Sequence, residues 1–211
     1  CTNPYSCPFF EHCKKSEPAG PEFPIDTLPR AGKALIERLN ASGWEDLRQV
    51  PLSELASPVH RRVAEVTRSG VTYFSEDFKD VLDGIAYPRY YLDFETIGFV
   101  VPRWISHRPF EQIPFQFSCH VETSEGHVRH EEFLDTSGNS PVNGFVDALI
   151  HAVGNDGPIL VWNRGFEGAR VRALAERFPG HAPALSAIVA RMLDLLPIYR
   201  DHYYHKDMRG S

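Results

Sequence analysis

Two acidic residues with one residue between them, Asp93 and Glu95, lie in an aromatic segment that predicts a β-strand. Because successive side chains of a strand point to opposite faces of its sheet, these two carboxylates leave the same face. Adjacent carboxylates repel each other, and a bound cation relieves that repulsion. Hard oxygen ligands of this kind suit Mg²⁺ or Mn²⁺. The pair therefore indicates a divalent-metal site, with a solvated strand face as the alternative.

Another acidic residue follows a second predicted strand. The segment Ile159–Trp162 is continuously apolar, as expected of a buried central strand, and the stretch from Asn163 to Glu167 leads from it into a helix. Ligands bind beyond the carboxyl ends of such strands, where a side chain of the first helical turn projects. Glu167 is therefore a candidate ligand. The alternative is local, because Asn163 favours a helix start and Glu167 is stabilised by the positive end of a helix.

The elements that would position these residues change in character at Pro88. Apolar residues recur at helical spacing before it, whereas alternating strand patterns follow it. The sequence predicts strands at 89–95, 113–121, 128–134 and 159–162, and helices at 145–153, 171–178 and 185–193. We therefore expect an α/β domain of order β-β-β-α-β-α at 88–211, preceded by a small helical module at 24–87 and a Cys-rich segment with a linker at 1–23.

Two short motifs resemble those of a known enzyme family. Tyr91-Leu92-Asp93-Phe94-Glu95-Thr96 resembles the first motif of the DEDD family of 3′–5′ exonucleases, a strand that carries Asp-x-Glu. Asn163-Arg164-Gly165-Phe166-Glu167 resembles the second motif, Asn-x-x-Phe-Asp, with Glu in the place of Asp. Arg191–Leu195, which includes Asp194, resembles the stretch that leads to the third motif, for which we assign no residues. More narrowly, the chain resembles a bacterial domain family found C-terminal to RecB-type nuclease modules.

This resemblance implies a mixed sheet of the ribonuclease-H type and two-metal hydrolysis of nucleic acid at single-stranded ends. Asp93 would bridge two Mg²⁺ or Mn²⁺ ions, Glu95 would bind one of them, and Glu167 would contact a metal directly or through water. Asn163, Asp194 and His205 are secondary candidates, His205 as a general base. A domain that binds nucleic acid or acts as a scaffold with an incomplete site is the alternative function.

Three cysteines, Cys1, Cys7 and Cys13, repeat with five residues between neighbours. A metal or cluster site is favoured over ordinary buried thiols, and a disulfide framework would need an oxidising compartment. The family resemblance implies a [4Fe–4S] cluster, with a fourth Cys upstream of Cys1. Zn²⁺ held by the three cysteines and His12 is the alternative. Cys119 lies in a predicted strand, and we expect it to be a core thiol.

The overall composition limits the mode of nucleic-acid binding. With 22 basic against 28 acidic residues, the net charge of −6 disfavours a broad cationic face that coats duplex DNA. No apolar stretch approaches the roughly 20 residues of a membrane span, and no signal-peptide pattern is present, so we expect a cytoplasmic protein. The chain starts at Cys1 and stops at Ser211. We expect it to be part of a longer polypeptide with an upstream RecB-type nuclease module, and to be weakly active or inactive by itself.

Overall fold

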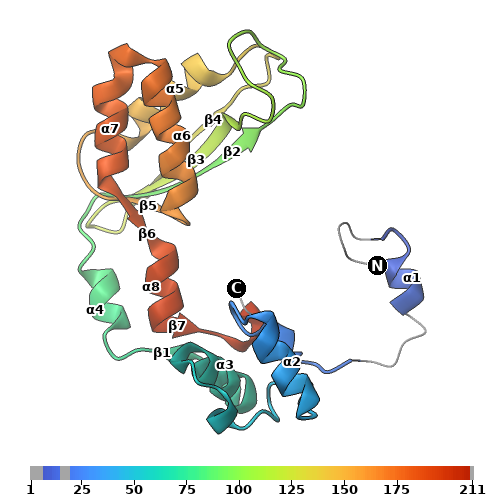
Figure 1. Cartoon of the computed structure of the whole chain (residues 1–211). Helices are drawn as coiled ribbons and strands as arrows, with labels where there is room; N and C mark the ends of the chain where they lie inside the picture. The colour runs from blue at the N-terminus through green and yellow to red at the C-terminus, as the bar shows by residue number, and fades with distance from the viewer. Residues whose placement is uncertain (1–6, 15–19, 210–211) are drawn as a thin grey trace. The chain divides into compact units, whose positions relative to one another are not determined.

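The computed structural model describes residues 7–14 and 20–209 (Figure 1). The chain divides into two compact units. The first unit comprises Cys1–Phe74 and Tyr203–Ser211, and the second comprises Ser75–His202. Among the described residues, no helix combines the length and the apolar character needed to cross a membrane.

The first unit is mostly helical. Its elements are α1 (Phe10–Lys14), η1 (Ile25–Thr27), α2 (Lys33–Ala41), η2 (Leu52–Glu54), α3 (Pro58–Ser69), β1 (Tyr73–Phe74), β7 (Tyr203–Tyr204) and η4 (Lys206–Met208). Proline suits the first turn of α3 because no backbone N–H is needed there, and Gly70 ends the helix with φ of 73°. Strand β7 pairs with β1 in antiparallel fashion, so the last described residues belong to the core of this unit.

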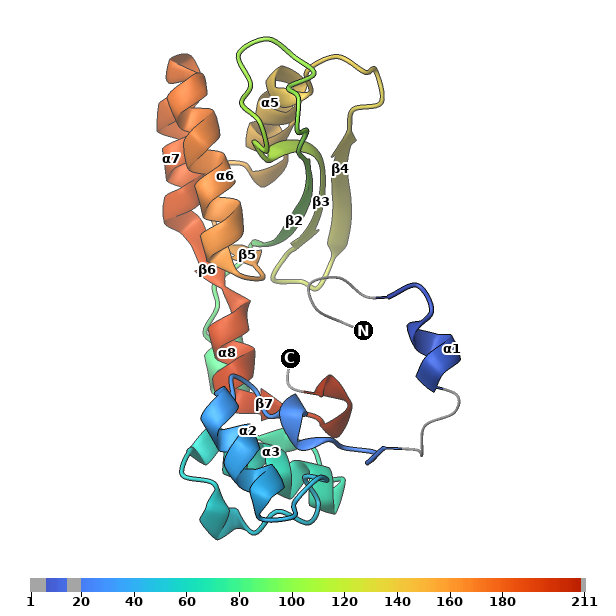
Figure 2. The same ribbon diagram turned by 45° about the vertical axis from the view of Figure 1, so that its right-hand side comes forward.

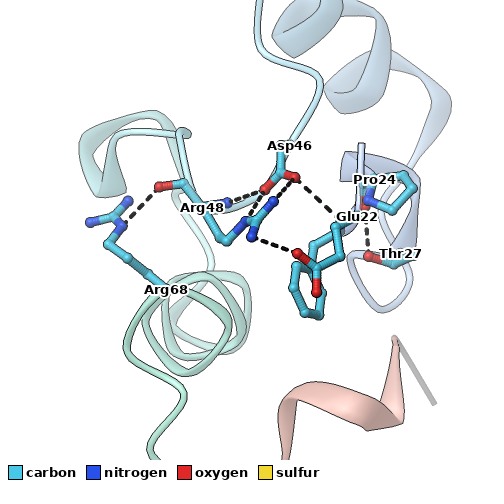
Figure 3. A network of polar contacts seen from close by, with 7 residues as sticks. Glu22, Pro24, Thr27, Asp46, Arg48 and Arg68 are labelled. Atoms are coloured by element: carbon cyan, nitrogen blue, oxygen red, sulfur yellow. Dashed lines mark hydrogen bonds and ion pairs between the residues drawn. The ribbon is translucent and has the colours of Figure 1, made fainter. Parts of the chain in front are cut away.

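A polar network ties the start of the first unit to its middle (Figure 3). The Asp46 carboxylate accepts hydrogen bonds from Nε and Nη2 of Arg48, at 2.9 and 2.8 Å, and a longer one from the backbone N–H of Phe23. Arg48 also contacts Glu22 at 2.7 Å. Asp46 is 5% exposed, and the neighbouring Arg48 guanidinium lowers its pKa to about 2. The network therefore replaces the water that a buried carboxylate loses.

The second unit contains a five-stranded mixed sheet. Its elements are α4 (Phe78–Asp83), β2 (Arg89–Ile97), β3 (Ile113–Glu122), β4 (Val128–Leu134), α5 (Val142–Val153), β5 (Ile159–Val161), α6 (Arg164–Arg177), η3 (Pro179–His181), α7 (Ala182–Arg191), β6 (Met192–Asp194) and α8 (Leu195–His202). The strand order is β4-β3-β2-β5-β6, with β3 antiparallel to β2 and β4, and with β2, β5 and β6 parallel. The predicted α/β class is thereby confirmed.

The end of one predicted helix is a strand in the structure. The helix expected at 185–193 ends at Arg191, and Met192–Asp194 form β6, which pairs with β5. Three residues are too few to show a period in the sequence, so only the pairing with β5 defines this strand. Because β6 runs parallel to β5, it places Asp194 beside Val161, at the carboxyl ends of the two strands.

Helices α5, α6 and α7 lie on one side of the sheet (Figure 2). The buried residues Tyr90, Leu92 and Phe94 of β2 face these helices and join a single hydrophobic core with them. The Phe94 ring lies 5.7 Å from that of Phe145 in α5 and 6.5 Å from that of Phe166 in α6, measured between centroids. The opposite face, which carries Tyr91, Asp93 and Glu95, is here called the outer face.

Candidate acidic site

Asp93 and Glu95 lie on the outer face of the central strand. Exposure alternates along β2, so that Leu92 and Phe94 are buried whereas Asp93 and Glu95 are exposed. The two carboxylates therefore leave the same face, as their spacing predicted. The strand that bears them is also the middle strand of the sheet and runs parallel to β5.

The turn after β5 brings a third carboxylate to this region. Asn163 follows the strand with φ of 72°, a left-handed conformation that asparagine tolerates better than most residues. Helix α6 begins at the next residue, and Glu167 in its first turn is only 4% exposed. Asn163 occupies the N-cap position of α6, as the local interpretation expected, but its side chain makes no capping hydrogen bond to the described residues.

The cap comes instead from the neighbouring strand. Oδ1 of Asp194, the last residue of β6, accepts hydrogen bonds of 3.0 Å from the backbone N–H groups of Asn163 and Leu196. Its Oδ2 accepts one of 3.0 Å from the N–H of Arg164. A carboxylate at this position accepts hydrogen bonds from N–H groups that have no partner within the helix. Its negative charge also interacts favourably with the positive end of the α6 dipole. Asp194 thus holds the segment that leads to Glu167.

Glu167 sits in an unfavourable electrostatic environment. Burial raises the pKa of its carboxyl, and the negative charges of Asp93 and Asp194 raise it further. Its Oε2 is buried and has no hydrogen-bond partner among the described residues. Buried polar atoms without a partner are rare, because each costs the free energy of removing it from water. Three carboxylates from β2, α6 and β6 therefore act on one another here. Asp93, Glu95, Glu167 and Asp194 are together called the acidic group.

The carboxylate oxygens of this group are the kind of donor that a hard divalent cation prefers. Such an ion would give Oε2 of Glu167 a partner and would offset the repulsion between Glu167 and Asp93. Asp93, Glu95 and Glu167 are the residues that would hold it, because the Asp194 oxygens already accept three N–H groups. Within the described residues, however, no three His, Cys, Asp or Glu side chains are arranged as a ready metal site.

Other candidates from the sequence lie elsewhere. His205 belongs to the first unit, where its Nδ1 accepts the N–H of Asp207 at 3.2 Å, and it is not among the residues that the second unit brings together. A further pair was not assigned from the sequence. Tyr203 and Asp207 have the four-residue spacing of the third DEDD motif, and both lie in the first unit.

The cysteine prediction is only partly covered by the structure. Cys1 lies outside the described residues, whereas Cys7 is half-buried just before α1 and Cys13 is exposed on that helix. The iron–sulfur and zinc alternatives both stay predictions. Cys119 lies in the core of the second unit with no exposed surface, which confirms it as a core thiol, and burial raises its pKa to about 11.

Two further features of the second unit were not predicted from the sequence. Trp162, at the end of β5, is 52% exposed, although the apolar run suggested a buried position. On the outer face, His120 of β3 pairs with His130 of β4, and their rings stack with centroids 4.4 Å apart. His130 also hydrogen-bonds to Ser118, which lies opposite Asp93. The alternation of residues 113–121 could have assigned His120 to the face of the acids.

Comparison with known proteins adds a family. No curated protein matches the chain, and no solved structure does. One family model matches from Tyr90 in β2 onward, and the matched region includes every residue of the acidic group. Because this match covers residues 90–211, more than half of the chain, the protein belongs to the family described as domain of unknown function DUF2779.

Proposed function

We propose that the second unit carries a divalent-metal-dependent site that hydrolyses phosphodiester bonds of nucleic acid, as a 3′–5′ exonuclease at single-stranded ends. The observation that carries the proposal is the buried carboxylate of Glu167. Within the part of the chain that the structure describes, its Oε2 lacks a hydrogen-bond partner, and the negative charges of Asp93 and Asp194 raise the pKa of the carboxyl. A buried acid next to other acids, without a compensating partner, lowers the stability of the fold. Residues with such strongly perturbed pKa values are typical of functional sites.

The arrangement of the sheet supports the proposal. The DEDD-like motif at Asp93 and Glu95 lies on the central strand, and the motif that ends in Glu167 follows the adjacent parallel strand. This is the relationship that a ribonuclease-H-like sheet requires of the strands that carry these motifs. Cleavage polarity and preference for single strands rest on the motif resemblance alone. That resemblance also suggests an upstream RecB-type nuclease module in the same polypeptide as the partner.

The four acidic residues would have different roles in this site. Asp93 and Glu95 are exposed and would hold Mg²⁺ or Mn²⁺, while Glu167 would add a third oxygen ligand directly or through water. When bound, such ions offset charge on the scissile phosphate and lower the pKa of a bound water. Asp194 would position Glu167 through the three backbone N–H groups that it accepts at the start of α6 and α8.

A specific observation favours the alternative of a non-catalytic domain. The described residues contain no ready group of three metal ligands, and Glu167 stands where the DEDD motif has Asp. Its extra methylene changes the reach of the carboxylate. A domain that kept the acids but lost metal binding would bind nucleic acid or act as a scaffold without cleaving it.

The test is a cleavage assay on 5′-labelled single- and double-stranded DNA and RNA with Mg²⁺, Mn²⁺ or EDTA. We expect metal-dependent shortening from the 3′ end, and we expect Asp93→Asn and Glu167→Gln to reduce it roughly 100-fold or more. Glu132→Gln, an exposed acid on β4, is the matched control and should retain activity. Undiminished metal-dependent cleavage by Asp93→Asn would refute the proposal. Nucleic-acid binding without any cleavage would favour the alternative.

We also propose that Cys1, Cys7 and Cys13 contribute to a [4Fe–4S] cluster or a zinc site. Their regular spacing is the support for this, together with the resemblance to segments that accompany RecB-type modules. Elemental analysis of anaerobically purified full-length protein tests it. Stoichiometric iron with sulfide, or stoichiometric zinc, is expected, and loss of that metal on Cys7→Ser would assign it to these thiols. Absence of both metals would refute the proposal.

A further inference from the structure

Trp162 lies one residue before Asn163, whose backbone N–H donates a hydrogen bond to Asp194 of the acidic group. In β5, Ile159 and Val161 belong to the core shared with the helices, so the side chain of Leu160 between them points to the outer face. Leu160 pairs with Tyr91 of β2 in parallel register. The pairing of β5 with β2 ends at Leu160, and the last residue of β5, Val161, pairs with Asp194 of β6. Trp162 therefore directly follows the strand at the end where Asp194 lies. The indole is 52% exposed, whereas the three residues of β5 before it are buried.

The indole is also held in place. Its ring lies 5.7 Å from that of Tyr199 in α8, with an interplanar angle of 55°. Asp194 accepts the N–H of Asn163, directly after Trp162, and the N–H of Leu196 in α8. One carboxylate therefore fixes both the turn that carries the indole and the start of the helix that carries Tyr199. A large apolar ring that is half exposed and already fixed by its neighbours can contact a ligand with little further loss of side-chain conformational entropy.

We propose that Trp162 is a stacking platform for a nucleobase at the single-stranded end of a nucleic acid whose phosphate lies at the acidic group. This inference rests on the proposed function and adds a substrate contact to it. The carboxylates repel a phosphate backbone, so a strand needs an uncharged contact nearby in addition to metal ions. An indole face supplies one for any base, because every base has a π-face, and the resulting binding tolerates different sequences.

Binding measured without cleavage tests this contact. The full chain is titrated, with Ca²⁺ or EDTA in place of Mg²⁺, into a 5′-fluorescein decanucleotide of single-stranded DNA, and affinity is read from anisotropy. We expect Trp162→Ala to weaken binding about tenfold and Trp162→Phe to restore most of it. Phe110→Ala is the matched control, because Phe110 is an exposed aromatic residue of the same unit, and it should bind as the wild type does.

An oligonucleotide with an abasic 3′-terminal nucleotide separates stacking from other effects. The wild type should bind it more weakly, and the difference between wild type and Trp162→Ala should disappear. Equal affinity of wild type and Trp162→Ala for the intact oligonucleotide would overturn the inference. So would a Trp162→Ala defect that is as large on the abasic oligonucleotide, because the lost contact would then not involve a base.

Fluorescence gives a readout that does not depend on folding of the alanine variant. The chain has three tryptophans, so replacing Trp44 and Trp104 by Phe leaves Trp162 as the sole indole emitter. We expect acrylamide to quench its emission, and saturating oligonucleotide both to quench it and to protect it from acrylamide. An unchanged spectrum at saturation would overturn the inference, as would an indole that acrylamide cannot reach. If cleavage requires Asp93 but the fluorescence of Trp162 does not respond to the oligonucleotide, the proposed function is supported and the stacking role of Trp162 is refuted.

Discussion

The carboxylate of Asp194, the last residue of β6, accepts a hydrogen bond of 3.0 Å from the backbone N–H of Asn163, just after β5. The same side chain accepts the N–H groups of Arg164 and Leu196, so it joins the start of α6 to the start of α8. This anion is supplied from a parallel neighbouring strand rather than from the residue before the helix. The conformation of the turn between Trp162 and Glu167 therefore depends on the pairing of β5 with β6.

Replacing Asp194 tests this dependence. Asp194→Ala leaves three backbone N–H groups without their acceptor, and we expect a loss of about 1–2 kcal/mol in the free energy of unfolding. Asp194→Asn retains a carbonyl oxygen and should lose less. Urea denaturation measures both, with Glu176→Ala on the exposed surface of α6 as the control. If Asp194→Ala is as stable as the control, the three hydrogen bonds do not support the turn.

Glu167 should be a site where function and stability conflict. Glu167→Gln keeps the shape of the side chain but removes a charge that burial and two nearby acids disfavour. In EDTA we expect the variant to be more stable than the wild type by on the order of 1 kcal/mol. Thermal unfolding measures this, and added Mn²⁺ should raise the melting temperature of the wild type more than that of the variant.

The pH dependence of the Glu167→Gln effect has a definite sign. A carboxyl whose pKa is raised by folding binds its proton more tightly in the folded state, so ionisation destabilises the fold. The wild type should therefore lose stability relative to the variant as pH rises above the ordinary value of 4.5. The stability gained by the substitution should be larger at pH 8 than at pH 5. A gain that is absent at both pH values would contradict the assigned environment of Glu167.

Much of the fold could be predicted from sequence because local patterns report it. Alternating apolar residues defined the strand at 113–121, and a strand was also predicted at 128–134; the structure has them as β3 and β4 within one residue at their ends. The apolar run before Asn163 defined β5. Strand β6 could not be predicted, since its three residues follow a helix directly and only hydrogen bonding to β5 makes them a strand. Trp162 was assigned to the buried strand because hydrophobicity alone does not tell where a strand ends.

The candidate site was predictable in its residues but not in its electrostatics. The spacing of Asp93 and Glu95 was enough to place them on one face. The burial of Glu167 depends on how α6 packs on the sheet, and the role of Asp194 depends on a strand pairing across about 30 residues of chain. Neither is encoded in a local pattern. The sequence could therefore name the acids without telling which of them is buried and which of them accepts the backbone N–H groups at the start of α6.

Asp46 should make the first unit sensitive to acid. Arg48 lowers its pKa from 3.8 to about 2, so the folded state favours the ionised carboxylate. The resulting stabilisation is present above pH 4 and is lost as pH falls towards 2. We expect Asp46→Asn to cost roughly 2 kcal/mol at pH 7 and little near pH 2. Denaturation curves across this range measure the effect, with the exposed Asp26→Asn as control. A cost that does not change with pH would exclude the ion pair as its cause.

Cys119 should be chemically inert in the folded protein. Its side chain has no exposed surface, and burial raises its pKa to about 11, so the reactive thiolate is scarce at pH 8. We expect a Cys1→Ser, Cys7→Ser, Cys13→Ser variant to react with a disulfide reagent only after denaturation. Rapid reaction of the native variant would mean that the core around β3 opens readily.

Gly157 should be required for the pairing that places Glu167 near Asp93. It lies in the turn before β5 with φ of +73°, and a Cβ atom there would be 2.1 Å from the carbonyl oxygen of Pro88. Next to this contact, the N–H of Tyr90 donates to the carbonyl oxygen of Pro158 at 3.1 Å, where β2 and β5 begin to pair.

The obstructing atom near Gly157 belongs to the backbone, so a small side-chain movement cannot relieve the clash. We expect Gly157→Ala to cost about 3 kcal/mol or more, which combines an unfavourable φ with separation of the two strands. Gly126→Ala is the matched control, because its φ of +79° is equally unfavourable but no atom lies within 4 Å of the added Cβ. It should cost only about 1–2 kcal/mol. Urea denaturation measures both variants. Equal losses would show that backbone conformation alone is responsible, and that the close approach of Pro88 to this turn does not hold β2 and β5 in register.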